Sequence, residues 1–474
     1  MMKLESIDIE ETTKRIQRLL KEERNLSPAL VASVEVLLII VSLLVGRLGL
    51  NSKNSHKPPS ADPNRKKVKK TPGKRKPGGQ NGHEGVTLQK TDNPDRIEEI
   101  KVDRSTLPPG DYKEDGYEAR QVVDLDIHKI VTEYRAQVLK DSLGKTYRAD
   151  FPEGVNRPVQ YGVNVKVHAV YMSQFQLIPY NRVEEAFFDQ TEIPISGGTV
   201  YNFNEDAYNR LGEFDAIARS RLIASALIHA DETGINIDGK RVWLHSASND
   251  LWTYYYPHAK RGGEAIDAMG IIPKFKGVLC HDHWKPYFNY DCQHALCNAH
   301  HLRELERAWE QDGQRWAKDL KELLSEINQA VNDAGARLDA KASTAYRKKY
   351  RAILDKAQTE CPPPDESQRR GGRGRIKKTK ARNLLERLIA FEKETLRFMD
   401  DPIIPFTNNQ GENDIRMTKV QQKISGCFRS EKGAAIFCRI RGYLSTCRKH
   451  GMNASAALRT LFEDESPDFL TESS

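Results

Sequence analysis

The chain has 474 residues, long enough for about three domains with a large apolar core. Lys and Arg number 74 against 66 Asp and Glu, a net charge of +8, so the local concentration of positive charge matters more than the total. Seven cysteines without framework spacing, and no signal peptide, argue against a disulfide-framed secreted protein and indicate a reducing cytoplasm.

Residues 1–50 predict a helical segment whose most apolar stretch is 36–45. Between Glu35 and Arg47 there are only 11 uncharged residues, fewer than the roughly 20 that a membrane-spanning helix requires. We therefore expect self-association rather than a membrane anchor, although packing on another helix of the same chain stays open. The residues that would form a coiled-coil seam, spaced in alternating steps of four and three, are Leu30, Val34, Leu37, Val41, Leu44 and Leu48.

Residues 51–95 form a linker rich in Pro, Gly and Lys, a composition that cannot bury enough surface to fold alone. A solvated linker is one interpretation. We favour a disordered arm that follows DNA phosphates, because positive charge is concentrated in its middle. The residues expected to contact DNA here are Arg65, Lys66, Lys67, Lys69, Lys70, Lys74, Arg75 and Lys76.

Residues 96–155 alternate apolar and polar side chains in short runs, which predicts a small β module. Residues 156–220 are helical in pattern. A helix over 181–188, a turn over 189–195 and a second helix capped by Ser196 fit a DNA-reading helix-turn-helix. They fit any other helical subdomain equally well.

Residues 221–302 predict the first part of an α/β core, a mixed sheet flanked by helices. An apolar strand from Leu222 to Ile228 leads past Asp231, and Asp238-Gly239 is a hairpin turn sequence. Two further strands, a helix and the short strand 277–280 follow. This order is typical of an RNase H-like core, in which the fourth strand pairs with the first and would bring Asp231 and Asp282 to one edge.

Residues 303–403 predict a helical insertion with a basic loop at its middle. The composition of this loop fits both a solvated loop and a DNA clamp. Residues 404–455 would complete the core with the helix of Glu412 and an amphipathic helix over 434–449, and residues 456–474 would form a tail. The basic loop residues, within a basic run over 369–382, are Arg369, Arg370, Arg373, Arg375, Lys377 and Lys378.

Asp231 and Asp282 each follow a short apolar strand, and Glu412 lies in a predicted helix. Singly, each aspartate could start a turn, and Glu412 could pair with Arg416 four residues later. Together, three such carboxylates can hold two divalent cations about 3.5–4 Å apart, which clamp the attacking and leaving oxygens of a phosphodiester. In a basic chain this predicts an enzyme that cuts and joins DNA.

A second constellation is compatible with zinc, since Cys297 and His300 have a spacing that metal sites use. We instead expect Cys280 in the core, and Cys297 and His300 one helical turn apart as support for the active site. Cys427, Cys438 and Cys447 look like core residues. The full constellation is Cys280, His281, His283, Cys292, His294, Cys297, His300 and His301.

At these residues the chain resembles the transposases of the insertion sequence 66 family over nearly its whole length. Two local signatures carry the resemblance, over 51–63 and 78–85. Two further motifs carry the chemistry: His229-Ala230-Asp231-Glu232-Thr233, and the block from Asn408-Asn409 through Glu412 to Arg416.

The resemblance implies a DDE transposase in which Asp231, Asp282 and Glu412 form the acidic triad. Two Mg²⁺ or Mn²⁺ ions would bind there, Asp231 to both and the other two to one each. Asn408 and Asn409 would start the helix of Glu412, and Arg416 would contact phosphate or orient Glu412. Relatives hold zinc with paired cysteines after the linker, whereas residues 102–140 contain none, which argues against zinc there.

The expected partners are the DNA of the element's ends and of the target, a second copy of the chain, and in some members companion proteins of the same element. No membrane partner is expected, and the protein would be cytoplasmic, on the bacterial nucleoid. The alternative function is a catalytically inactive DNA-binding accessory or regulatory protein.

Overall fold

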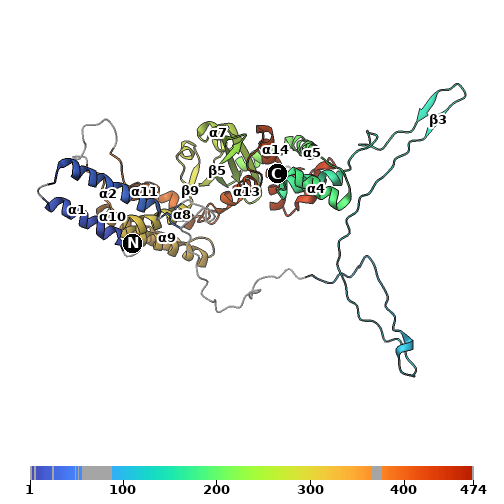
Figure 1. The fold of residues 1–474 in the computed structure, drawn as a ribbon, viewed down its shortest axis with the longest axis horizontal. Helices are drawn as coiled ribbons and strands as arrows, with labels where there is room; N and C mark the ends of the chain where they lie inside the picture. The colour runs from blue at the N-terminus through green and yellow to red at the C-terminus, as the bar shows by residue number, and fades with distance from the viewer. Residues whose placement is uncertain are drawn as a thin grey trace.

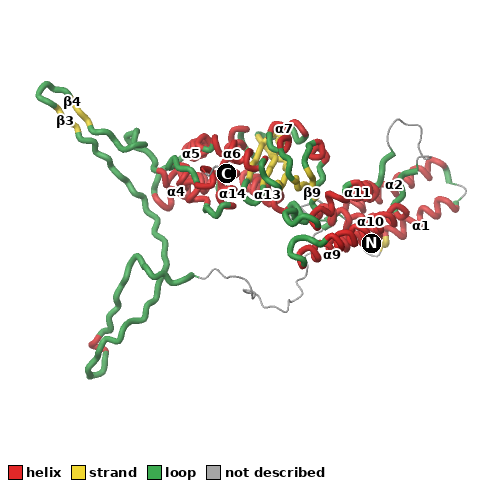
Figure 2. The backbone as a smooth tube through the Cα atoms, turned by 180° about the vertical axis from the view of Figure 1, so that it is seen from behind, coloured by secondary structure: helices red, strands yellow, loops and turns green. Residues whose placement is uncertain are grey.

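The computed structural model describes residues 3–4, 7–23, 26–48, 50–51, 53–55, 88–365 and 376–471. The body is elongated, with a five-stranded sheet in its middle and a group of helices at each end (Figure 1). Two long arms leave the body on the side of α4 and α5, and the view from behind shows the same separation (Figure 2).

The N-terminal segment is a helical hairpin. Strands β1 (Lys3–Leu4) and β2 (Ile7–Asp8) precede α1 (Ile9–Glu22) and α2 (Pro28–Leu48). Val31, Val34 and Leu38 of α2 are half-buried. Much of the predicted coiled-coil seam is exposed instead, namely Leu30, Leu37, Val41 and Leu44.

Helix α2 is also long and apolar enough, by length and composition, to cross a membrane. Its window Pro28–Val45 has a mean hydropathy of 2.5 and is 6% buried. From the sequence, the uncharged run after Glu35 looked too short. The helix begins at Pro28, however, so the apolar window also includes the residues before Glu35 and contains only that one charged residue. One helix near an N-terminus is weak support for a membrane span, since other kinds of helix have the same composition.

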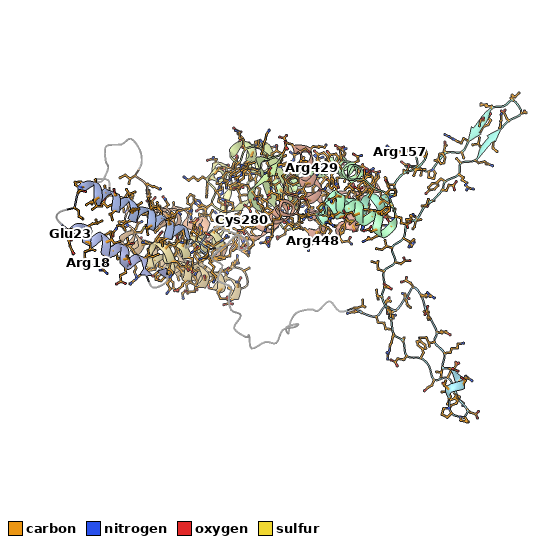
Figure 3. The ribbon with its side chains drawn as sticks, viewed as in Figure 1. Arg18, Glu23, Arg157, Cys280, Arg429 and Arg448 are labelled. Atoms are coloured by element: carbon orange, nitrogen blue, oxygen red, sulfur yellow. The ribbon has the colours of Figure 1, made fainter. Side chains whose placement is uncertain are left out.

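The small β module expected over 96–155 is reduced to two open arms. Its secondary structure consists of the 3₁₀ turn η2 (Arg104–Thr106) and a hairpin of β3 (Val138–Lys140) and β4 (Thr146–Arg148). Alternating apolar residues such as Val122, Leu125 and Ile130 are exposed, because no second layer covers them. Side chains along both arms point into open space, and Arg157 lies near the base of the upper arm (Figure 3).

The helical segment before the sheet agrees with the predicted helix-turn-helix order. Helix α4 (Tyr180–Thr191) is capped by Glu192, and α5 (Gly197–Arg210) begins after Ser196, whose hydroxyl accepts the N–H of Thr199 at 3.2 Å. The predicted cap is therefore confirmed. Around this pair lie α3 (Val163–Val170), the π-helix η3 (Tyr171–Phe175) and α6 (Gly212–Ile223).

The sheet is mixed, with the order β7-β6-β5-β8-β9. Its first strand begins at Leu227 rather than Leu222, because α6 continues through Ile223. The predicted Asp238-Gly239 turn is confirmed, with positive φ at both residues. The strands are β5 (Leu227–Ile237), β6 (Lys240–Ser248), β7 (Thr253–His258), β8 (Val278–His281) and β9 (Gln293–Leu296).

Strands β5, β6 and β7 are antiparallel neighbours, whereas β8 pairs in parallel with β5 and β9 in parallel with β8. The predicted pairing of the fourth strand with the first is therefore confirmed. The connections between these strands contain α7 (Gly263–Met269) and the 3₁₀ turns η4 (Ile272–Lys274) and η5 (Lys285–Asn289).

The expected insertion is helical, and it packs onto the sheet. Val278, Cys280 and Ala295 share a core with its helices, while Ile228 and Leu279 belong to the core with α5, α6 and α14. Its elements are α8 (Asn298–Asp312), α9 (Arg315–Asp333), α10 (Ala340–Glu360), α11 (Lys380–Ala390), α12 (Glu392–Leu396) and η7 (Arg397–Met399).

Four helices close the chain: α13 (Asn409–Ser425), α14 (Glu431–Lys449), α15 (Ala454–Phe462) and α16 (Asp468–Thr471). The expected C-terminal tail is largely a packed helix instead. Ala457, Leu458 and Phe462 of α15 are buried in the same core as Val170 and Val200. An apolar face on 454–462 drives this packing, which the sequence interpretation overlooked.

Candidate metal-binding active site

Two of the three predicted carboxylates come from neighbouring strands. Asp231 lies inside β5 and pairs in register with Ser246 of β6, so it is not at the strand's end as expected. The parallel pairing of β5 with β8 stops at His229 opposite Cys280, and Asp282 follows directly after β8. Each aspartate is thus two residues past the last parallel pair, which aligns them at one edge of that pairing.

The third carboxylate arrives on α13, which begins at Asn409 and carries Glu412 in its first turn. Asn408 precedes the helix as predicted, but its buried side chain does not cap it. Its Nδ2 donates to the carbonyl oxygen of Ala230 at 2.9 Å, and its Oδ1 lies 2.7 Å from Nδ1 of His229. The side chain of Asn409, by contrast, is exposed.

Electrostatic coupling shows that the three carboxylates share one region. Burial raises the pKa of Asp231 well above its ordinary value, and the negative charges of Glu232, Asp282 and Glu412 raise it further. Glu232 has a raised pKa as well, first through burial and then through Asp282. Several buried carboxylates held together repel one another, and a bound cation would remove that repulsion.

The donor set fits hard divalent cations such as Mg²⁺ or Mn²⁺, which take oxygen ligands. Oε1 of Glu412 is buried and accepts no hydrogen bond within the described part of the chain. The oxygens of Asp231, Asp282 and Glu412 are not gathered within the 4.8 Å that one small group of ligands would show.

A fourth carboxylate, which the sequence interpretation missed, braces the site. Glu232 has a side chain only 1% exposed and pairs with Arg261 at 2.6 Å. Its second oxygen accepts the hydroxyl of Tyr287 at 2.8 Å. The guanidinium of Arg261 is stacked between the rings of Trp243 and Trp284, 4.7 and 4.6 Å from their centroids.

The contacts of Glu232 and Arg261 extend to the loop of Asp282. The backbone N–H of Trp284 donates to Oδ1 of Asp282 at 3.1 Å, and Trp284 is one of the two rings that enclose Arg261. His283 between them has a φ of 73°, a left-handed conformation that costs free energy in a non-glycine residue. The packing of Trp284 against Arg261 therefore stabilises the strained turn that positions Asp282.

Cys297 and His300 lie beside Glu412, one turn apart at the start of α8 as expected. Nδ1 of His300 is 3.7 Å and Nη2 of Arg303 is 3.5 Å from Oε1 of Glu412. Arg303, rather than the exposed Arg416, is thus the arginine beside Glu412. Cys280, Cys438 and Cys447 are buried as predicted, and Cys427 is half-buried.

The residues predicted to contact DNA are only partly described. Those of the linker (Arg65, Lys66, Lys67, Lys69, Lys70, Lys74, Arg75, Lys76) and Arg369, Arg370, Arg373 and Arg375 of the loop lie outside the described residues. Lys377 is exposed, whereas Lys378 pairs with Glu386. Arg382, within the predicted basic run 369–382, is buried against Glu386 and the carbonyl oxygen of Cys361, so it supports the fold.

Sequence signals existed for some of the missed residues. Arg303 continues the three-residue spacing of Cys297 and His300 along α8, which places it on the same helical face. Glu232 stood in the quoted motif beside Asp231. Arg261 and Tyr287 gave no local signal, because tertiary folding alone brings them to Glu232.

Comparison with known proteins bears directly on this site. Residues 158–436 match the family described as Transposase IS66 family, and residues 3–89 match a family of unknown function, DUF6444. A search of curated proteins gave no match. The first match covers more than half of the 474 residues and includes all three carboxylates. The chain therefore belongs to the IS66 family of transposases.

Proposed function

We propose that this protein is a DDE-type DNA transposase that cleaves the ends of an insertion element and joins them to target DNA. The observation that carries the proposal is the geometry around Asp231, Asp282 and Glu412, which are up to 181 positions apart in the sequence: the parallel pairing of β5 with β8 aligns the two aspartates, and Asn408 ties the helix of Glu412 to β5. The strand order supports an RNase H-like core around them. Membership of a transposase family supports the same activity and implies interaction with DNA.

Asp231, Asp282 and Glu412 would hold two Mg²⁺ or Mn²⁺ ions, with Asp231 shared between them. When bound, the ions supply activation of water and of the freed 3′-hydroxyl, and they stabilise the leaving oxygen. The chain's own residues keep the carboxylates in place. Asn408 ties the helix of Glu412 to β5, and the Glu232–Arg261 pair braces the loop of Asp282.

DNA would be held by basic segments and read by the helical pair. The runs over 65–76 and 369–378 would contact the phosphate backbone, and α4 with α5 would recognise the element's ends. Support comes from the composition of the runs and from the succession of α4, a turn and α5. Arg416, exposed four residues after Glu412, would contact a phosphate near the cleavage point.

The protein would act as a homo-oligomer in the bacterial cytoplasm, on the nucleoid, with other proteins of the element as further partners. The exposed seam of α2 supports self-association, because a 3.5-residue apolar spacing suits a coiled coil. The arms support it too: residues 88–150 carry 14 acidic against 11 basic residues and many exposed apolar ones, which suits a protein surface better than DNA.

The test is cleavage of a labelled DNA containing the element's end, with Mg²⁺, by the purified full chain. Asp231→Asn, Asp282→Asn and Glu412→Gln should each abolish nicking and leave DNA affinity within about twofold. Asp291→Asn, an exposed aspartate after η5, is the matched control and should nick normally. Normal DNA binding without nicking by the unaltered chain would instead favour an inactive accessory protein.

A further inference from the structure

Cys297 occupies an environment suited to a metal-binding sulfur. It is 1% exposed and immediately precedes α8. Its Sγ accepts the backbone N–H of Asn408 at 3.1 Å. A backbone donor to the sulfur stabilises the thiolate form that binds a metal.

Two further ligand types converge on this sulfur. Sγ of Cys297, a ring nitrogen of His300 and a carboxylate oxygen of Glu412 all lie within 4.8 Å of one another. The His300 side chain is 16% exposed and that of Glu412 31%, so solvent reaches two of the three side chains. Arg303, 3.5 Å from Glu412, balances part of the negative charge.

Within the described part of the chain, this is the one group of three or more such residues that is gathered so closely. Six other members of the sequence constellation, Cys280, His281, His283, Cys292, His294 and His301, do not join it. His281 instead bonds His294 at 3.2 Å, and His301 bonds Asn298 at 3.0 Å. These hydrogen bonds account for His281, His294 and His301, and burial in the core accounts for Cys280.

The donor chemistry differs from that of the carboxylate set. Sulfur, imidazole nitrogen and one carboxylate oxygen suit Zn²⁺, which takes four tetrahedral ligands at about 2.0–2.3 Å and often leaves one position open. Ligand atoms around such an ion would be about 3.3–3.6 Å apart, so small side-chain rotations must close the present spacing. Mg²⁺ takes oxygen ligands and would not use the sulfur.

We propose that Cys297, His300 and Glu412 form a binding site for a thiophilic divalent cation such as Zn²⁺, adjacent to the all-oxygen site for Mg²⁺. The site itself follows from the three side chains. A consequence rests on the proposed function: because Glu412 belongs to both ligand sets, Zn²⁺ bound to Cys297 withdraws Glu412 from the Mg²⁺ site. Zn²⁺ is then an inhibitor of DNA cleavage rather than a cofactor.

Cobalt(II) is the probe, since a bound thiolate gives a sulfur-to-cobalt charge-transfer band in the near ultraviolet. The full-length, metal-free chain titrated with Co²⁺ should show this band with one equivalent, and Zn²⁺ should remove it. Cys297→Ser should lose the band. Cys292→Ser, which removes a half-buried thiol outside the group, is the matched control and should keep it.

His300→Asn and Glu412→Gln keep Cys297 and guard against a misfolded serine variant, with circular dichroism and thermal unfolding as checks on folding. Each should weaken Co²⁺ binding by at least about 100-fold, since loss of even an outer hydrogen-bond partner costs about 10–100-fold. No sulfur band in the unaltered chain, or a band that persists in Cys297→Ser, would overturn the site.

The inhibitory consequence has its own readout. Nicking with Mg²⁺ is measured with and without micromolar Zn²⁺, and each variant is compared with its own zinc-free rate. The unaltered chain and Cys292→Ser should lose activity at least tenfold, and Cys297→Ser should resist. Equal inhibition of Cys297→Ser would refute the competition for Glu412. Absence of nicking altogether would count against the transposase proposal, while the cobalt band would still decide the metal site.

Discussion

Asn408 donates a hydrogen bond from Nδ2 to the carbonyl oxygen of Ala230, 2.9 Å away, and so fixes the start of the Glu412 helix against the strand of Asp231. The two residues are 178 positions apart. Its Oδ1 contacts His229, and its backbone N–H donates to Sγ of Cys297. The side chain and the backbone of Asn408 therefore join the Glu412 helix to β5 and to the residue before α8.

Replacement of Asn408 by Ala should destabilise the protein by about 1–3 kcal/mol, because it leaves buried polar groups of Ala230 and His229 without partners. It should also weaken Mn²⁺ binding, since the helix of Glu412 loses its attachment. Chemical denaturation and Mn²⁺ titration monitored by electron paramagnetic resonance measure both effects. Asn409→Ala, at the exposed neighbouring position, is the control, and equal effects at both positions would contradict this role.

Loss of the Glu232–Arg261 pair should impair catalysis without abolishing it. Glu232→Gln keeps the shape and the Tyr287 contact but removes the charge that holds Arg261. We expect a fall of about 10–100-fold in nicking rate or Mn²⁺ affinity, the range typical of outer partners of metal ligands. A complete loss, equal to that of Asp231→Asn, would mean that Glu232 itself is a ligand.

Without metal, the stability of the protein should depend on pH through Asp231. Its pKa is raised in the folded state, so its contribution to stability is complete below the ordinary aspartate pKa of about 3.9 and is lost as pH rises through the raised value. At neutral pH the metal-free Asp231→Asn protein should therefore melt at a higher temperature than the unaltered chain.

Mg²⁺ should reverse the order of these two melting temperatures. A cation at a hundredfold excess over its dissociation constant stabilises the folded state by about 2.7 kcal/mol, and Asp231→Asn should forgo most of that gain. Differential scanning calorimetry at pH 5 and pH 8, with and without Mg²⁺, measures both effects. Identical melting curves for the two proteins in all four conditions would refute the carboxylate repulsion.

The exposed seam of α2 should mediate self-association. Leu37→Lys with Val41→Lys places two charges on the seam, which should reduce the mass measured by light scattering to that of a single chain. Val31→Ala, on the half-buried face of the same helix, is the control. An unchanged mass in the double variant would assign self-association to another surface, such as the arms.

Much of the fold around the site was predictable from local patterns. The Asp238-Gly239 hairpin, the Ser196 cap and the pairing of the fourth strand with the first are confirmed, because each depends on short-range turn chemistry or on strand order. The position of Asp231 inside β5 was not predicted. Strand β5 is longer than its partner β8. Asp231 therefore follows the last residue of β5 that pairs with β8, but it still lies inside β5.

Other parts depend on tertiary context. The alternating pattern over 96–155 predicted a β module, but alternation forms a sheet only where another layer covers its apolar face. The side chain of Asn408 was expected to serve the start of a helix, whereas burial directs it to Ala230 and His229. Arg261 and Tyr287 reach Glu232 only through the folded sheet, and no sequence spacing announces them.

Anomalous diffraction at the manganese edge, recorded from crystals of the full chain soaked in Mn²⁺, shows whether Asp231, Asp282 and Glu412 hold a pair of cations. Two peaks about 3.5–4 Å apart are expected, with Asp231 in contact with both and Asp282 and Glu412 with one each. Manganese absent from these three side chains, or a single ion that leaves Asp231 without contact, would contradict it.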